Sequence, residues 1–149
     1  MKRVIKKNGF TYVEILLAVS IMAILLSISI PSYSAMHNRI AVKNDVYLIS
    51  SALRNAQNDS LVSKYGLKHG LYFHADSYSV FSGDWSSPYQ KKDYQLSGGA
   101  SIISGADSSI VFERLTGEAN SHYIIILSNN GDQYKISVSS KGQIETEKL

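Results

Sequence analysis

The sequence predicts an α+β protein in which one long N-terminal helix, from about Phe10 to Val62, precedes an antiparallel β-sheet. Two observations support this class. Apolar residues follow a helical spacing up to Val62, and after Gly66 the pattern changes to the short segments typical of strands. With 149 residues the chain can form one domain with a modest core. It has no cysteine, which excludes disulfides, thiolate metal sites and cysteine nucleophiles.

The formal net charge of +3 arises from the first nine residues. Lys2, Arg3, Lys6 and Lys7 are four of the fifteen basic residues. From Phe10 onward, eleven basic residues face twelve acidic ones. This near balance weakens the general electrostatic case for DNA binding.

Residues 10–36 are predicted to form an apolar helix of membrane length. No charged residue occurs from Ile15 to Met36, and a helix over residues 10–30 would extend roughly 31 Å, close to the hydrocarbon thickness of a bilayer. The basic residues before it place that end in the cytoplasm. Two alternatives are a secretory signal peptide cut within residues 27–35 and an ordinary single-pass anchor. Neither explains Glu14, because a carboxylate is costly in hydrocarbon.

The residues at the start of this helix resemble a known processing signal. The run Lys7-Asn8-Gly9-Phe10-Thr11-Tyr12-Val13-Glu14 is similar to the class III signal of type IV pilins and type II secretion pseudopilins, with Tyr12 where leucine is commoner. The resemblance implies the pilin fold. It also implies that a prepilin peptidase removes residues 1–9 by cutting between Gly9 and Phe10, and then N-methylates Phe10.

Glu14 and Pro31 match two further positions of this family. The resemblance implies that Glu14 directs assembly by neutralising the terminal amine of a neighbouring subunit, since a buried charge is tolerated when it gains a partner. The alternative places the Glu14 carboxylate among lipid headgroups. Pro31 lies where many members have a helix-kinking proline, and it lacks a backbone N–H and disfavours helical conformation at Ile30. We therefore expect a kinked helix.

Residues 37–149 are predicted to form a globular head that begins with an amphipathic helix over residues 37–63. Its apolar stripe is predicted to pack on the sheet and consists of Val42, Val46, Ile49, Leu53 and Ala56. About six strands are predicted in one antiparallel sheet, at residues 70–74, 78–82, 109–113, 123–127, 133–138 and 143–145. Asn130-Gly131-Asp132 is a hairpin signal. Residues 83–99 are predicted to be a variable loop, and whether it binds a ligand is left open.

The head resembles the GspH/FimT-like minor pseudopilins. The resemblance rests on residues 52–60 (Ala-Leu-Arg-Asn-Ala-Gln-Asn-Asp-Ser) before a Gly-Leu-Tyr-Phe strand, on Ile110-Val111-Phe112 followed by Gly117, and on a late Ser-Lys-Gly-Gln-Ile hairpin at 140–144. The lack of cysteine argues against those major pilins that carry a C-terminal disulfide loop.

Catalytic and metal-binding motifs are not found in the sequence. His69 and His74 are five residues apart, but no carboxylate pattern completes a zinc site, and we expect both to be surface histidines. The sequence contains neither a Gly-x-Ser-x-Gly elbow nor a phosphate-binding loop nor an EF-hand. We therefore predict no enzyme, no cofactor and no metal.

DNA binding for DNA uptake is the more specific alternative function, because some FimT-like minor pilins bind DNA through a basic C-terminal tail. Here Glu145 and Glu147 stand where cations would be needed. Tyrosine and lysine are interleaved around Tyr89 to Tyr94 and could stack on bases. On this balance nucleic acid is not an expected partner.

The sequence thus predicts a non-catalytic structural subunit, a minor pilin or pseudopilin, of a type IV pilus or a type II secretion pseudopilus. It would cross the inner membrane once, with its N-terminus in the cytoplasm and its head outside, and then join a periplasmic or cell-surface filament. Its partners would be the prepilin peptidase, other pilins, the assembly platform with its ATPase, and membrane lipid. A membrane-anchored extracytoplasmic binding protein that never polymerises and a secreted enzyme remain alternatives. Secretion, adhesion, motility and DNA uptake use one subunit plan, so the sequence does not choose among them. It also leaves open the major or minor status of the subunit, its filament position and the host envelope type.

Overall fold

The structure, a computed structural model, describes residues 9–120, 122–128 and 131–149, without the side chains of residues 28–35, 125, 127 and 128. It divides into two units, residues 1–36 and 37–149. Helix α1 (Tyr12–Leu61) begins in the first unit and ends in the second. This confirms the predicted long helix. The kink expected at Pro31 stays a prediction, because Pro31 is among residues 28–35, whose side chains the structure does not describe.

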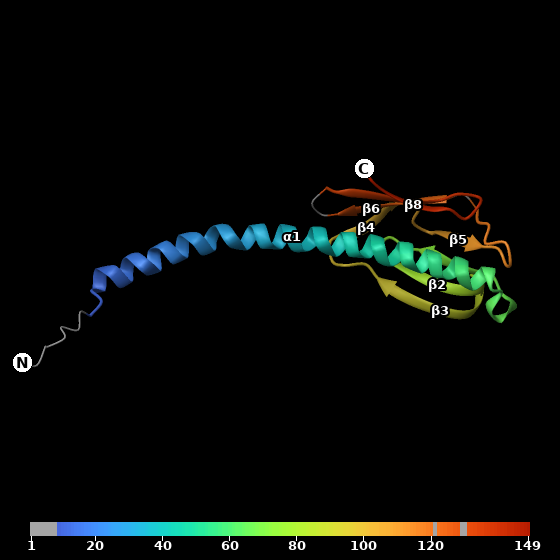
Figure 1. Cartoon of the computed structure of the whole chain (residues 1–149), viewed down its shortest axis with the longest axis horizontal. Coiled ribbons are helices and arrows are strands. Elements are labelled where there is room, and N and C mark those ends of the chain that lie inside the picture. The colour runs from blue at the N-terminus through green and yellow to red at the C-terminus, as the bar shows by residue number, and fades with distance from the viewer. Residues whose placement is uncertain (1–8, 121, 129–130) are drawn as a thin grey trace, which may run out of the picture. The chain divides into compact units, whose positions relative to one another are not determined.

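The second unit carries the sheets. Its described residues form the short 3-10 helix η1 (Lys64–Gly66) and eight strands: β1 (His69–Phe73), β2 (Ser77–Asp84), β3 (Ser87–Gln95), β4 (Ala100–Ser104), β5 (Ser108–Phe112), β6 (His122–Ser128), β7 (Gln133–Val138) and β8 (Ile144–Lys148). Sheet A has the strand order β3-β2-β1-β5, and sheet B has the order β4-β6-β7-β8 (Figure 1). Neighbouring strands are antiparallel in both sheets. The α+β class is confirmed, but the prediction of one sheet with about six strands is wrong.

The predicted loop over residues 83–99 is wrong as well. Strand β2 continues to Asp84, and β3 pairs with it along its whole length, with an irregularity between Ser82 and Gly83. β3 is an edge strand and most of its side chains are exposed. Its sequence therefore lacks the alternation of apolar and polar residues that marks a half-buried strand. Proline and lysine, which protect sheet edges from further pairing, are the residues that made it look like a loop.

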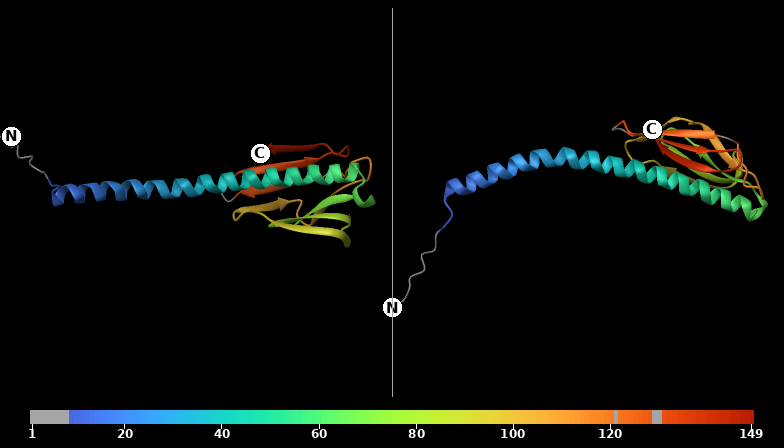
Figure 2. Two further views of the ribbon diagram at one scale, coloured as in Figure 1. Left: turned by 60° about the horizontal axis from the view of Figure 1, so that its bottom comes forward. Right: turned by 45° about the horizontal axis from the view of Figure 1, so that its top comes forward.

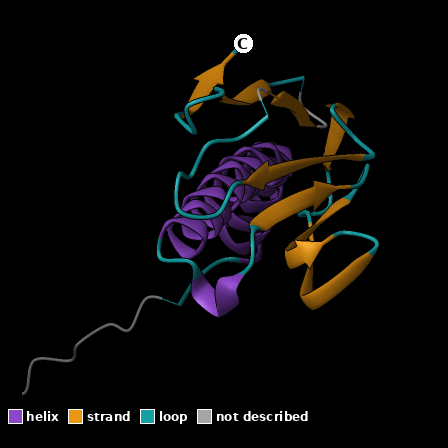
Figure 3. Cartoon of the chain, turned by 90° about the vertical axis from the view of Figure 1, so that its right-hand side faces the viewer, coloured by secondary structure: helices purple, strands orange, loops and turns teal. Residues whose placement is uncertain are grey.

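Within the second unit, helix α1 covers the junction between the two sheets. β2 and β3 lie on one flank of the helix and the strands of sheet B lie on the other (Figures 1 and 2). Figure 3 looks along the helix and shows the strands above it and to its right. The predicted stripe is confirmed, because its five side chains are 0–5% exposed. They share one core with side chains of both sheets, among them Leu71, Phe73, Ile110, Phe112, Ile124, Ile126, Ile136 and Val138.

Two buried polar side chains of α1 fix the helix against sheet A. The Ser60 hydroxyl donates to the Phe112 carbonyl and accepts from the His69 N–H, both at 3.0 Å. The Asp45 carboxylate accepts from the N–H of Ser97 at 2.9 Å and from its hydroxyl at 3.1 Å. Because buried backbone groups need partners, these side chains satisfy strand and loop atoms that the ladders leave unpaired.

Tyr78 is expected to resist ionisation in the folded protein. Its side chain is 5% exposed and stacks on Tyr94, with 5.1 Å between the ring centroids. Burial, with smaller contributions from Tyr94 and Asp45, raises the pKa of Tyr78 to about 12. An unfolded tyrosine titrates near pH 10, so the folded state keeps a proton that the unfolded state loses. The resulting stability is fully present below pH 10 and is lost as the pH rises from about 10 to about 12.

Urea unfolding across this pH range measures the effect. The free energy of unfolding should fall by up to about 1.4 kcal/mol per pH unit more in the wild type than in Tyr78→Phe, which has no phenol to titrate. Parallel pH profiles for the two proteins would show that Tyr78 ionises normally.

Candidate functional site

Gly9 and Phe10 lie just before α1, in a stretch without helix or strand. Both residues are exposed, Phe10 to 84%. A Cβ added to Gly9 would meet no heavy atom within 4 Å. The peptide bond between them is therefore accessible, and the packing of this chain does not require a glycine at position 9. Any requirement for glycine there has to come from the site of another molecule.

Thr11 and Glu14 form reciprocal hydrogen bonds at the start of α1. Glu14 Oε2 accepts from the Thr11 N–H and from the Thr11 hydroxyl, both at 2.9 Å, and the Glu14 N–H donates to Thr11 Oγ1 at 3.3 Å. This is a capping box of the Thr-x-x-Glu type. A carboxylate in the first turn also interacts favourably with the helix dipole. Sequence reasoning missed this role, although the Thr-x-x-Glu spacing was the signal for it.

On both sides of Glu14, from residue 12 to residue 26, α1 exposes apolar side chains all around its axis. The large ones are 50–79% exposed and are Tyr12, Val13, Ile15, Leu16, Leu17, Val19, Ile21, Met22, Ile24, Leu25 and Leu26. The hydroxyls of Ser20 and Ser27 donate to the carbonyls of Leu16 and Ile24, at 2.8 and 2.7 Å, so they need no outside partner. A helix that is apolar on every side requires another molecule to cover it.

Among the described residues, no helix combines the length and apolarity needed to cross a membrane. Part of the predicted span over residues 10–36 lies outside the described side chains, at residues 28–35.

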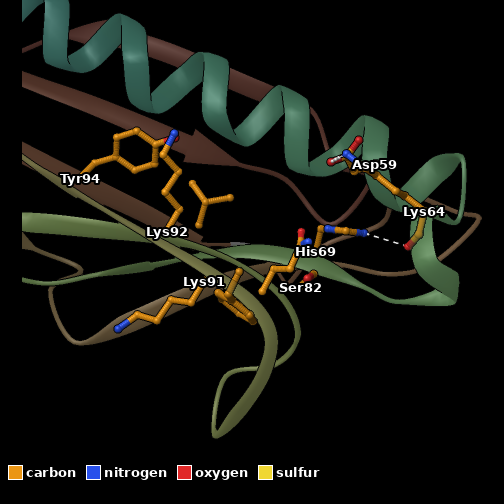
Figure 4. Close-up of a pocket in the computed structure, with 10 residues that line it drawn as sticks. Asp59, Lys64, His69, Ser82, Lys91, Lys92 and Tyr94 are labelled. Atoms are coloured by element: carbon orange, nitrogen blue, oxygen red, sulfur yellow. Dashed lines mark hydrogen bonds and ion pairs between the residues drawn. The ribbon is translucent and has the colours of Figure 1, made fainter.

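A polar hollow opens between the end of α1 and the helix-facing side of sheet A (Figure 4). Lys64 Nζ lies 2.9 Å from Asp59 Oδ2, and His69 Nε2 lies 3.2 Å from the Lys64 carbonyl oxygen. His69 is 5% exposed, so the expectation of a surface histidine is wrong for it. It is buried because strand alternation places it on the same face of β1 as Leu71 and Phe73, which belong to the core. Its backbone N–H bonds to Ser60 at the end of α1.

His74 lies elsewhere, beyond the end of β1. Its ring contacts Tyr72, and its Nδ1 lies 3.9 Å from Asp107 Oδ1. The two histidines are thus not brought together. Within the described ranges, no group of three or more histidine, aspartate or glutamate side chains is placed to hold a metal.

The tyrosine and lysine segment of residues 89–94 is divided between the two faces of β3. Lys91 contributes to the lining of the hollow, but the end of its side chain extends away from Tyr94 and Lys92 in Figure 4, and its Nζ lies 4.9 Å from the centroid of the Trp85 ring. Lys92 lies on the hollow side, with its Nζ 5.0 Å from the Tyr94 centroid. Because successive strand residues face opposite ways, the segment does not form one stacking surface for bases.

Neither the protein-family models nor the curated protein sequences include a match to this sequence. Among solved structures, the minor pseudopilin EpsH from the type 2 secretion system of Vibrio cholerae matches with a TM-score of 0.58 and 11% sequence identity. The match covers 72% of this chain and 97% of that one. The chain has the fold of a minor pseudopilin. The fold that the sequence resemblance implied is therefore confirmed, and at this identity the match concerns the fold alone.

Proposed function

We propose that the chain is a non-catalytic structural subunit of a pseudopilus or a related type IV filament, processed between Gly9 and Phe10. One observation carries the proposal: an accessible Gly-Phe bond directly precedes a capped, all-round apolar helix, in a chain whose fold is that of a minor pseudopilin. The order of parts suits a subunit that is cut, stored and then assembled.

The apolar helix would be covered twice in the life of the subunit. Lipid of the inner membrane would cover residues 10–36 before assembly, with the head outside the cytoplasm. Helices of other pilins would cover the same side chains in the filament, where the contact is again apolar. The prepilin peptidase and the assembly platform with its ATPase would act between these two stages.

Glu14 would have two roles in succession. In the uncut chain its Oε2 accepts two hydrogen bonds from Thr11, one from the backbone N–H and one from the hydroxyl. A carboxylate has about four acceptor positions, so the cap leaves capacity for a further donor. Cleavage after Gly9 would create an ammonium group at Phe10, and Glu14 would pair with the ammonium group of a neighbouring subunit on assembly. An unpaired Glu14 in a wrong register would be disfavoured.

Intact mass and N-terminal sequencing after coexpression with a prepilin peptidase test the processing. We expect a chain that begins at N-methylated Phe10, and no cleavage of Gly9→Leu. Because Gly9 makes no packing contact, the thermal unfolding of that variant should match the wild type. An uncut wild-type chain, with the peptidase active on a control substrate, would instead indicate a plain membrane anchor. Cleavage within residues 27–35 would indicate a secreted protein.

Glu14→Gln separates the charge of Glu14 from its capping role. Glutamine also serves at the third position of a capping box, so the helix should begin normally and cleavage should proceed. Incorporation into filaments, measured by quantitative mass spectrometry of sheared filaments, should fall about tenfold or more because the charge is lost. Normal incorporation of Glu14→Gln beside failure of Glu14→Ala would assign Glu14 to capping alone.

A further inference from the structure

A groove on the head gathers cations from two elements that are distant in the sequence. Helix α1 contributes Lys43, Tyr47, Ser50 and Arg54, whose spacing of four, three and four places them on one face. Strands β7 and β8 supply the opposite wall, which consists of Tyr134, Thr146 and Lys148. The hollow has a volume of about 610 Å³, and Val46 forms part of its floor. We call it the basic groove, because none of the described residues that line it is acidic.

The pleat of β8 keeps the C-terminal glutamates out of the basic groove. Thr146 and Lys148 line the groove, and the Thr146 hydroxyl lies 3.0 Å from that of Ser50 on α1. Glu145 and Glu147 alternate with them along the strand, so they point to the other face of sheet B. The glutamates that counted against a cationic site in the sequence therefore do not neutralise it.

The cations of the groove are incompletely paired. Among the described residues, Lys43 and Arg54 are exposed and have no ion pair. Lys148 lies 2.8 Å from Asp132, but this carboxylate also receives Arg39 at 3.5 Å. Two cations thus share one carboxylate. Tyr47 is 70% exposed beside them, and tyrosine with arginine is a combination enriched where proteins bind one another.

The same head carries a segment of complementary chemistry between β5 and β6. Residues 113–118 present Leu115, which is 61% exposed and has a left-handed backbone with φ of 69°. The Leu115 N–H donates to the Ser60 carbonyl at 2.9 Å, and the Glu113 N–H donates to the Glu118 carbonyl at 2.7 Å. Both glutamate side chains are exposed. We call this segment the acidic knob: it carries Leu115 and two exposed carboxylates on a backbone that hydrogen bonds hold in place. Its one cation, Arg114, donates to the Gly66 carbonyl at 3.1 Å.

We propose that the acidic knob of one copy docks in the basic groove of the next copy. Leu115 would contact Tyr47, and the two glutamates of the knob would pair with Lys43 and Arg54. The inference rests on the proposed function, because it names a contact between the heads of filament subunits. The charges from residue 10 onward nearly balance, whereas nucleic-acid binding depends on a net positive potential that extends far from the surface. This balance favours a protein partner over nucleic acid.

The geometry of the two surfaces favours a filament over a closed pair. Knob and groove are different surfaces of one head, so the contact is heterologous and can be repeated from copy to copy. Leu115 is held at Ser60, and the groove is lined by residues between 43 and 54 of the same helix, whose midpoint is about twelve residues before Ser60. The two surfaces are thus separated by roughly 18 Å along α1, at 1.5 Å per residue. Each docked copy would be displaced along the helix direction relative to the one before it.

Disulfide trapping between two tagged copies tests the contact. The chain has no cysteine, so Tyr47→Cys in one full-length copy and Leu115→Cys in a second are the sole thiols. Mixed in detergent micelles and mildly oxidised, they should form a dimer that carries both tags. The matched control pairs Tyr47→Cys with Asp107→Cys, whose side chain is 82% exposed at the opposite end of β5. A yield no higher than in this control overturns the proposal.

Charge reversal tests the complementarity. Glu113→Lys with Glu118→Lys on the knob copy, or Lys43→Glu with Arg54→Glu on the groove copy, should lower the cross-link yield about tenfold. Reversing both surfaces together should restore it. Unchanged yields after single-sided reversal overturn the proposal. A nucleic-acid site is tested with a fluorescent single-stranded oligonucleotide. If the oligonucleotide binds the wild type but not the Lys43→Glu and Arg54→Glu variant, and the cross-link yield stays at background, the proposal is also overturned.

This experiment uses the uncut chain and needs neither peptidase nor filament. A failure of cleavage at Gly9 would therefore leave the cross-linking result intact. A failure of cross-linking would likewise leave the processing result intact.

Discussion

Gly142→Ala is expected to destabilise the head by about 3–5 kcal/mol, a large share of the stability of an ordinary domain. Gly142 has φ of 79°, a conformation that costs an alanine about 1–2 kcal/mol. An added Cβ would also overlap Gln57 Nε2 and the Gly117 carbonyl oxygen. Displacing Gln57 breaks its hydrogen bonds to the carbonyls of Gly142, at 2.9 Å, and Gly117, at 3.3 Å. These bonds join α1 to the turn between β7 and β8 and to the segment between β5 and β6, so the overlap and the lost bonds account for the remainder.

Gly131→Ala provides the matched control for this prediction. Gly131 has φ of 84°, but a Cβ added there would meet nothing within 4 Å. Its substitution should cost only the conformational part, about 1–2 kcal/mol. Urea unfolding of both variants measures the difference. If the two losses were equal, the contact of Gly142 with Gln57 and Gly117 would have no energetic role.

The parts of the fold that could be predicted from the sequence are those with a strong periodic signal. The stripe from Val42 to Ala56 repeats with the helical period, and it is buried as predicted. The strands that contribute core residues, such as β5 and β7, alternate or run apolar, and they were located to within about a residue. Burial imposes these patterns, so they can be read before the partner surface is known.

The missed parts are those where burial imposes no pattern. β3 is exposed along most of its length, and β4 is five residues long with Ile102 as its one buried side chain among the described residues. The division into two sheets depends on which edges pair. β1 pairs with β5 across a sequence separation of 39 residues, as between Leu71 and Ile110. No local sequence feature records such a pairing. Tertiary context alone decides it.

The candidate site shows the same division. A linear motif predicts Gly9, Phe10 and Glu14 as the candidate site, and their accessibility and the capping box are features of local structure. The basic groove could not be predicted, because it combines α1 with the last strand. In the sequence, Lys148 stands next to Glu147 and their charges cancel. In the fold, strand alternation separates them onto opposite faces, so a count of charges along the tail does not give the charge of either face.

Ser60→Ala is the second substitution with a large expected effect, a loss of about 2–4 kcal/mol in the free energy of unfolding. The side chain is fully buried, and its hydroxyl bridges β1 and β5 by accepting from His69 and donating to Phe112. Removing the hydroxyl leaves a buried N–H and a buried carbonyl without partners. Each such group costs about 1–3 kcal/mol, which exceeds the small gain from burying a methyl group.

Ser82→Ala is the control that distinguishes a lost hydrogen bond from a lost hydroxyl. Ser82 is 2% exposed, and its hydroxyl has no hydrogen-bond partner among the described residues. The same change of atoms should therefore be neutral or slightly stabilising there, because no partner is left unsatisfied. Urea unfolding of both variants at neutral pH gives the comparison. Equal losses would mean that the Ser60 bridge adds nothing beyond packing, whereas the expected contrast would identify it as the bond that holds the end of α1 to sheet A.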